Sequence, residues 1–159
     1  MLVSAIAAGV LCGLVLRGDL RRLGALQIVG APFLFAAVGL RLLAPFLPFA
    51  PLPLYLLSLA GLVVVAWVNR DLPGAVLIGA GATLNLVVIA ANGGMPVDLA
   101  AAASVGSAGP HDPLHVVLGP ESRLTFLADV IPFFRSVYSA GDFVIAAGAF
   151  WLPLRALRP

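Results

Sequence analysis

Five long apolar stretches alternate with short polar connections along the chain. They cover residues 1–16, 23–43, 54–68, 75–91 and 139–154. A helix needs about 20 apolar residues to cross a hydrocarbon core of about 30 Å, and tilt or bilayer thinning accommodates shorter ones. The pattern therefore predicts an all-α membrane protein with about five transmembrane helices, folded as a single integral membrane domain over residues 1–159.

Residues 92–137 break this pattern, because they hold both histidines and several of the few charged side chains. Within them, residues 120–131 place apolar side chains at helical spacing on one side, with polar ones on the other. Pro120 suits a first helical turn, and Glu121 suits the positive end of the helix dipole. We expect a loop that carries an amphipathic helix at the membrane surface.

Composition supports a membrane setting. Hydrophobic residues make up 62% of the chain and charged residues 10%, whereas a soluble domain carries about 25% charged residues. This composition argues against a water-soluble fold and against disorder. The single cysteine, Cys12, excludes a disulfide framework within the chain.

The net charge of +2 comes from scattered arginines that form no run along which nucleic acid phosphates could lie. We therefore expect no nucleic acid partner. The expected partners are membrane lipids and either other membrane proteins or further copies of this chain.

Arginine positions predict an orientation, since cytoplasmic loops of membrane proteins carry an excess of basic residues. With the N-terminus outside, three arginines fall on the outer side, and six fall on the cytoplasmic side: Arg17, Arg21, Arg22, Arg70, Arg155 and Arg158. We expect a multi-pass protein of a bacterial inner (plasma) membrane. Its C-terminus would be cytoplasmic, and the loop of residues 92–137 would face outward.

The most distinctive motif is Asn-Gly-Gly-Met-Pro-Val, formed by Asn92, Gly93, Gly94, Met95 and Pro96 with the valine that follows. Glycine tolerates the left-handed conformation that ends many helices, so a tight helix exit is expected here. The motif resembles the signature of an uncharacterised family of small bacterial integral membrane proteins, and the likeness continues through residues 124–132 and 137–148. The resemblance implies a membrane topology and no reaction.

Asp129 and Asp142 are the candidate catalytic residues, although neither is assigned a catalytic role. Two carboxylates at a membrane interface can share a proton and activate water. Residues 137–148 are also similar to the second aspartate motif of lipoprotein signal peptidases, but the Asn-x-x-Asp-Arg element of those enzymes is missing. A structural alternative is a capping box from Ser139 to Asp142, with Asp129 solvated or paired with an arginine, Arg123 or Arg135.

Other polar residues suggest weaker sites. His111 and His115 have the spacing of a helical metal site, but Pro113 between them favours a turn. We expect neither a metal nor a cofactor. Asn85 lies near the middle of an apolar stretch, where it either lines a substrate path or forms a hydrogen bond between helices.

These observations predict a non-catalytic accessory or assembly subunit of a larger membrane complex, or a homo-oligomer. Small residues such as Gly9 and Gly13 would provide close helix contacts. The alternatives are an interfacial aspartate-dyad hydrolase that uses Asp129 and Asp142, and a small transporter that uses Asn85.

Overall fold

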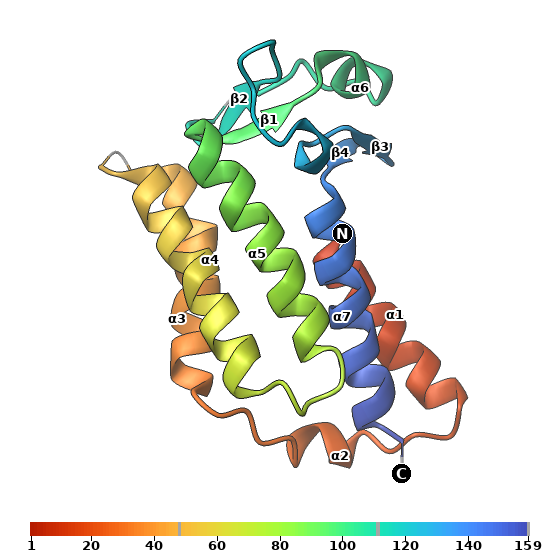
Figure 1. Ribbon diagram of the computed structural model, residues 1–159. Coiled ribbons are helices and arrows are strands. Elements are labelled where there is room, and N and C mark those ends of the chain that lie inside the picture. Colours follow the sequence, from red (N-terminus) through yellow and green to blue (C-terminus); the bar gives the residue numbers. More distant parts are fainter. Residues whose placement is uncertain (48, 111, 159) are drawn as a thin grey trace.

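Five helices form the body of the protein in a computed structural model that describes residues 1–47, 49–110 and 112–158 (Figure 1). These helices are α1 (Leu2–Val15), α3 (Ala31–Leu43), α4 (Pro51–Val68), α5 (Ala75–Asn92) and α7 (Ala140–Ala156). The shorter helical elements are α2 (Arg21–Gly24), η1 (Ala44–Phe46), α6 (Leu99–Ser104) and η2 (Thr125–Leu127). The strands are β1 (Met95–Val97), β2 (His115–Val117), β3 (Ile131–Phe133) and β4 (Ser136–Tyr138).

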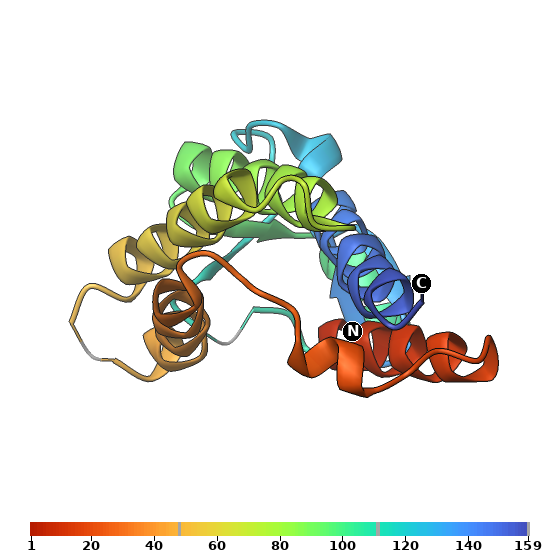
Figure 2. The same cartoon turned by 90° about the horizontal axis from the view of Figure 1, so that it is seen from below.

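The five helices follow one another around an open arc. The main helix contacts join α1 to α7, α7 to α5, α5 to α4 and α4 to α3. Figure 2 shows this arc from below, with α1 and α3 at its two ends and the segment containing α2 running between them. The concave side of the arc is therefore lined by all five helices.

Glycines allow α7 to lie close to its neighbours. A Cβ atom added at Gly81 of α5 would lie 2.5 Å from the carbonyl oxygen of Gly141, and one at Gly9 of α1 would overlap the carbonyl oxygen of Phe150. Helix association through small residues depends on such close backbone approach. The expectation that Gly9 and Gly13 provide a close helix contact is confirmed, because both are buried against α7.

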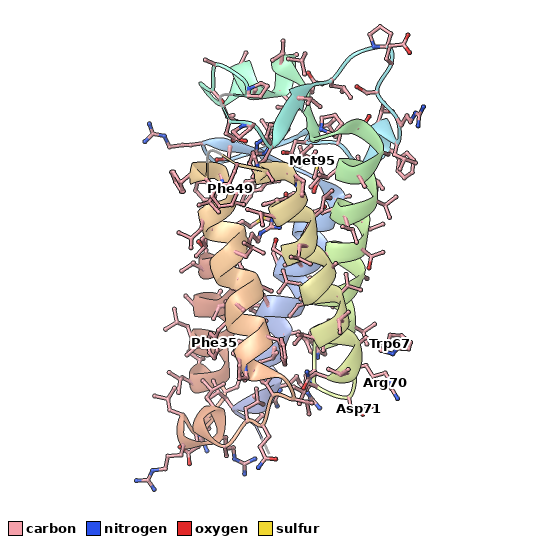
Figure 3. The ribbon with its side chains drawn as sticks, turned by 90° about the vertical axis from the view of Figure 1, so that its left-hand side faces the viewer. Phe35, Phe49, Trp67, Arg70, Asp71 and Met95 are labelled. Atoms are coloured by element: carbon pink, nitrogen blue, oxygen red, sulfur yellow. The ribbon has the colours of Figure 1, made fainter. Side chains whose placement is uncertain are left out.

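Residues 93–139 cover the end of the bundle where α5 ends and α7 begins, and we call this segment the cap (Figure 1). It contains a parallel pair of strands, β1 and β2, and an antiparallel pair, β3 and β4. Figure 3 shows Met95 at the capped end, while Trp67, Arg70 and Asp71 lie at the opposite end. The two ends of the protein thus differ in structure as well as in charge.

The prediction of an all-α protein with five transmembrane helices is wrong. The cap contains four short strands, and in the described part of the chain only α4 and α5 are long and apolar enough to cross a membrane. Each of these has 18 residues, with mean hydropathies of 2.0 and 1.9, whereas α1 has 14 residues and α3 has 13. Apolar character alone overestimated the lengths of the helices expected over residues 1–16 and 23–43.

The expected helix over residues 23–43 shows the reason. Helix α2 ends at Gly24, and α3 begins only after Gly30, which adopts a left-handed conformation with φ of 75°. The backbone of Val29 is instead bound to Asn69 at the end of α4. Val29 N–H donates to Asn69 Oδ1 at 2.8 Å, and Asn69 Nδ2 donates to Val29 O at 2.9 Å. Long-range hydrogen bonds thus replace the first turns of the expected helix.

The predicted amphipathic helix over residues 120–131 is also wrong. Only Thr125–Leu127 form a 3₁₀ turn, preceded by Leu124 with a φ of 54°, and Ile131 already begins β3. The backbone N–H of Asp129 donates to Pro96 O at 2.8 Å, and Asp129 O accepts from the N–H of Asp98 at 3.0 Å. Since these groups bind β1 and its continuation, they are not available to a helix.

Candidate functional site

A cavity of about 750 Å³ lies on the concave side of the arc, beneath the cap. All five long helices contribute to its lining, which is mostly apolar. Its lining residues on α7 run from Asp142 to Pro153, a helical rise of about 16 Å. The ionisable and amide side chains that line it come from α3, α4, α5, α7 and the cap: Arg41, Tyr55, Asn85, His115, Asp129, Tyr138 and Asp142.

The motif strand β1 brings two of these residues together. On one side it pairs with β2, where Met95 is opposite His115, and on the other side Val97 forms a parallel bridge with Asp129. Gly94 permits the first pairing, because a Cβ there would lie 2.9 Å from Val116 Cγ1 and 3.1 Å from Leu114 O. The strand thus fixes His115 and Asp129 as neighbours at the capped end of the cavity.

Asp129 is buried, with 6% of its surface exposed. Its Oδ2 lies 3.8 Å from His115 Nε2, and its Oδ1 has no hydrogen-bond partner among the described residues. Burial, the largest cause, and the charge of Asp142 together raise the pKa of Asp129 from 3.8 to about 8, against the lowering effect of Arg41. A carboxyl group with this pKa carries a proton at neutral pH and acts as a hydrogen-bond donor.

His115 is oriented by Asp112. The Nδ1 atom of His115 lies 2.8 Å from both carboxylate oxygens of Asp112, and the Leu114 N–H also donates to Asp112 Oδ1 at 2.8 Å. The side chain of Asp112 is 40% exposed, while Asp129 is buried. Asp112, His115 and Asp129 therefore form a line of ionisable groups from the surface of the cap to the cavity.

Asp142 belongs to a polar cluster between α5 and α7. The expected capping box is confirmed: Ser139 Oγ accepts from the Asp142 N–H at 3.1 Å, and Asp142 Oδ2 accepts from the Ser139 N–H at 3.3 Å. Asn85 Nδ2 donates to Asp142 Oδ1 at 2.9 Å, and Ser139 Oγ donates to Asn85 Oδ1 at 3.0 Å. Both oxygens of Asp142 thus have protein donors.

Arg41 is the cationic side chain in this group. Its guanidinium carbon lies 4.7 Å from the centre of the Tyr55 ring, a cation–π arrangement. Its Nη1 atom is buried, and within the described part of the chain it has no hydrogen-bond acceptor. The sequence signal for Arg41 is its position as a lone charge within an apolar stretch.

The structure brings Asp129, Asp142, Asn85 and His115 to one cavity, whereas the sequence analysis linked only Asp129 with Asp142 and treated Asn85 and His115 as separate candidates. The expected alternatives for Asp129, a solvated side chain or one paired with Arg123 or Arg135, are wrong: the side chain is buried, and within the described residues the group at ion-pair distance from it is His115.

The candidate metal pair is not supported. His111 lies outside the described residues, and His115 begins a strand rather than lying on a helix. Among residues 1–47, 49–110 and 112–158, no three His, Cys, Asp or Glu side chains are grouped as metal ligands.

The remaining residues of the Asn-Gly-Gly-Met-Pro-Val motif shape the backbone of the cap. Gly93 ends α5 in a left-handed conformation with φ of 70°, as expected. Asn92 joins the end of α5 to a distant part of the cap. Its Nδ2 donates to Arg123 O at 2.9 Å, and its Oδ1 accepts from the Arg123 N–H at 2.8 Å. Met95 and Pro96 lie in β1, so the motif organises the cap around the cavity.

The fold and site define a mostly helical protein with two apolar helices long enough to cross a membrane and a capped, mostly apolar cavity. A family model matches residues 25–154, and the chain belongs to this family, DUF5317, a family of unknown function. This confirms the expected membership of an uncharacterised family. No curated protein and no solved structure matches the chain.

Proposed function

We propose that this protein is a membrane protein that holds an amphipathic, lipid-like molecule in the cavity of its helix arc. The observation that carries the proposal is the distribution of polar groups along that cavity. The lining toward the end opposite the cap, including Leu34, Ile78 and Leu152, is apolar, whereas the ionisable side chains gather beneath the cap. A molecule with an apolar chain and one polar end is complementary to this lining.

The outer surface of the helices supports a hydrocarbon environment. Large apolar side chains are exposed on several helices: Val3 is 80% exposed, Phe33 74% and Val64 61%. Soluble monomers seldom expose extended apolar surface without a partner to cover it. Lipid chains are the partner that we propose for these faces.

The orientation that we propose places the cap on the outer side of a bacterial inner membrane. The arginines expected on the cytoplasmic side belong to three segments: Arg17 to Arg22, Arg70, and the C-terminal residues. Arg70 lies at the end opposite the cap (Figure 3), and Arg22 Nη1 donates to Arg158 O at 3.1 Å. Their accumulation at one end agrees with the preference of basic residues for the cytoplasmic side.

The accessory-subunit, hydrolase and transporter interpretations stay predictions. Lipid binding is compatible with an accessory role in a larger complex or a homo-oligomer. A hydrolase would require Asp142 to act on a substrate while its oxygens accept hydrogen bonds from Asn85 and Ser139. A transporter would require Asn85 to exchange those same bonds for contacts with its substrate.

The test is native mass spectrometry of the protein released from lipid nanodiscs. Val38 lines the cavity from α3, so Val38→Trp should fill part of it and lower the fraction of protein that carries a lipid-sized adduct. Phe33→Trp is the matched control, because Phe33 is 74% exposed on the same helix and does not line the cavity. Equal occupancy in the two variants, with both folded by circular dichroism, would contradict the proposal.

A further inference from the structure

The capped end of the cavity contains two buried polar atoms whose hydrogen-bonding capacity is unused within the described residues. They are Nη1 of Arg41, on α3, and Oδ1 of Asp129, in the cap. Buried polar atoms are nearly always paired, because an unpaired one loses its hydration without compensation. Both residues line the cavity, so a bound molecule can reach them. Two such atoms on different elements indicate a site for a polar group of that molecule.

The chemistry of the two residues selects the ligand group. Arg41 can only donate hydrogen bonds, and Asp129 donates in its protonated form. Asp142 also faces this space, but Asn85 and Ser139 already donate to its oxygens. A group that accepts hydrogen bonds and carries negative charge satisfies Arg41 and Asp129 together. Guanidinium groups match the oxygens of phosphates especially well.

We infer that Arg41 and Asp129 bind the phosphate group of an anionic phospholipid whose chains occupy the apolar part of the cavity. This inference rests on the proposed lipid-binding function and adds the identity of the headgroup. Arg41 supplies the charge, and its stacking on Tyr55 holds the guanidinium in place. Asp129 supplies a second donor from the cap, where β1 and His115 fix its position.

Binding should weaken as the pH rises through about 8, because Asp129 then loses its proton and becomes an anion. Among the described residues, the other ionisable side chains of this cavity are Arg41 from α3, Tyr55 from α4, Asp142 from α7, and His115 and Tyr138 from the cap, where Asp112 contacts His115. Asp129→Asn keeps a side-chain N–H donor and cannot ionise. The affinity of this variant should therefore change less than that of wild type between pH 6.5 and pH 9.

The experiment measures binding of dioleoyl phosphatidylglycerol to the full-length protein in nanodiscs, by competition with a fluorescent lipid. Dioleoylglycerol has the same chains without phosphate, and glycerol 3-phosphate has phosphate without chains. We expect wild type to favour phosphatidylglycerol over dioleoylglycerol by about tenfold or more, the effect of a hydrogen bond to a charged group. Glycerol 3-phosphate should compete only weakly, since it gains nothing from the apolar lining.

Arg41→Gln should weaken binding of phosphatidylglycerol more than binding of dioleoylglycerol and so remove the preference between them, and Arg41→Lys should restore part of that preference. Equal binding of the two lipids by folded wild-type protein would overturn the headgroup assignment and leave the lipid cavity standing. If folded wild-type protein binds neither lipid, the proposed function is overturned as well. Strong competition by glycerol 3-phosphate would show that a free phosphate is the ligand, which would also overturn the inference. An unchanged affinity of wild type between pH 6.5 and pH 9 would refute the role of Asp129.

Discussion

His115 Nε2 lies 3.8 Å from Asp129 Oδ2, although the two residues belong to separate parts of the cap. Strand β1 lies between their backbones and pairs with both of them. The contact therefore depends on the Asn-Gly-Gly-Met-Pro-Val motif, which supplies this strand. A motif that the sequence marks as a helix exit thus also positions two ionisable groups at the cavity.

The protonation of Asp129 predicts a pH-dependent stability. An ordinary aspartate has a pKa of 3.8, whereas that of Asp129 in the folded protein is raised to about 8. Between these values the folded state binds a proton that the unfolded state does not, so stability falls as the pH rises from about 4 to 8 and levels off above. Thermal unfolding in detergent at pH 5, 6.5, 8 and 9 measures this fall.

The control for this measurement is a second aspartate in the same cap. The melting temperature of Asp129→Asn should fall less than that of wild type between pH 5 and pH 8. That of Asp112→Asn should fall as much as that of wild type, because the Asp112 side chain is 40% exposed. If both variants show the pH dependence of wild type, Asp129 does not carry a proton in the folded state near neutral pH.

The cluster of Asn85, Ser139 and Asp142 predicts coupled effects of mutation. Asn85→Ala removes the amide that donates a hydrogen bond to Asp142 and accepts one from Ser139 where α5 packs against α7. Leaving these buried groups unpaired should cost about 1–3 kcal/mol of unfolding free energy. Ser139→Ala should cost about 0.5–2 kcal/mol, since it also removes the helix cap.

A double-mutant cycle between Asn85→Ala and Ser139→Ala tests whether the two residues act through their shared bond. The coupling energy should be about 0.5 kcal/mol or more, because directly bonded residues are not additive. Thr83→Ala is the control on α5, since Thr83 is exposed and bonds only to Gly79 O of its own helix. If the losses of unfolding free energy in Asn85→Ala and Ser139→Ala simply add in the double variant, the two residues do not act through a shared hydrogen bond.

The contact between α5 and α7 predicts opposite effects of alanine at two helical glycines. A Cβ at Gly81 would lie 2.5 Å from Gly141 O and 2.7 Å from the Ile145 nitrogen, so Gly81→Ala must separate the helices. We expect a loss of about 1–3 kcal/mol or more. At Gly39 of α3 nothing lies within 4 Å of the added Cβ, so Gly39→Ala should stabilise its helix by about 0.5–1 kcal/mol. Unfolding in denaturant measures both, and equal effects would refute the close contact.

The sequence predicts local features well where neighbouring residues determine them. The cap at Ser139 and the left-handed Gly93 are set by short-range chemistry, and both are present. The prediction of a helix over residues 120–131 was wrong, because the periodicity of the side chains does not reveal that the Asp129 backbone pairs with β1. The cavity was not predictable for the same reason, since Arg41 and Asp129 meet only through the tertiary fold.

The segment between α2 and α3 provides a last prediction, because long-range bonds replaced its expected helix. Asn69 is buried at the end of α4, accepts a bond from the Val29 N–H and donates to Val29 O and Val65 O. Asn69→Ala should therefore speed hydrogen exchange at the Val29 amide by about tenfold or more, since about 1.4 kcal/mol of lost protection corresponds to that factor.

Asp71→Ala is the control for Asn69→Ala, because Asp71 is exposed in the same turn. It should leave exchange at Val29 unchanged and alter stability by no more than about 0.5 kcal/mol. Residue-resolved exchange by mass spectrometry distinguishes these outcomes. Unchanged exchange at Val29 in Asn69→Ala would mean that residues 25–30 are held by other contacts, and the explanation given for the shortened α3 would fail.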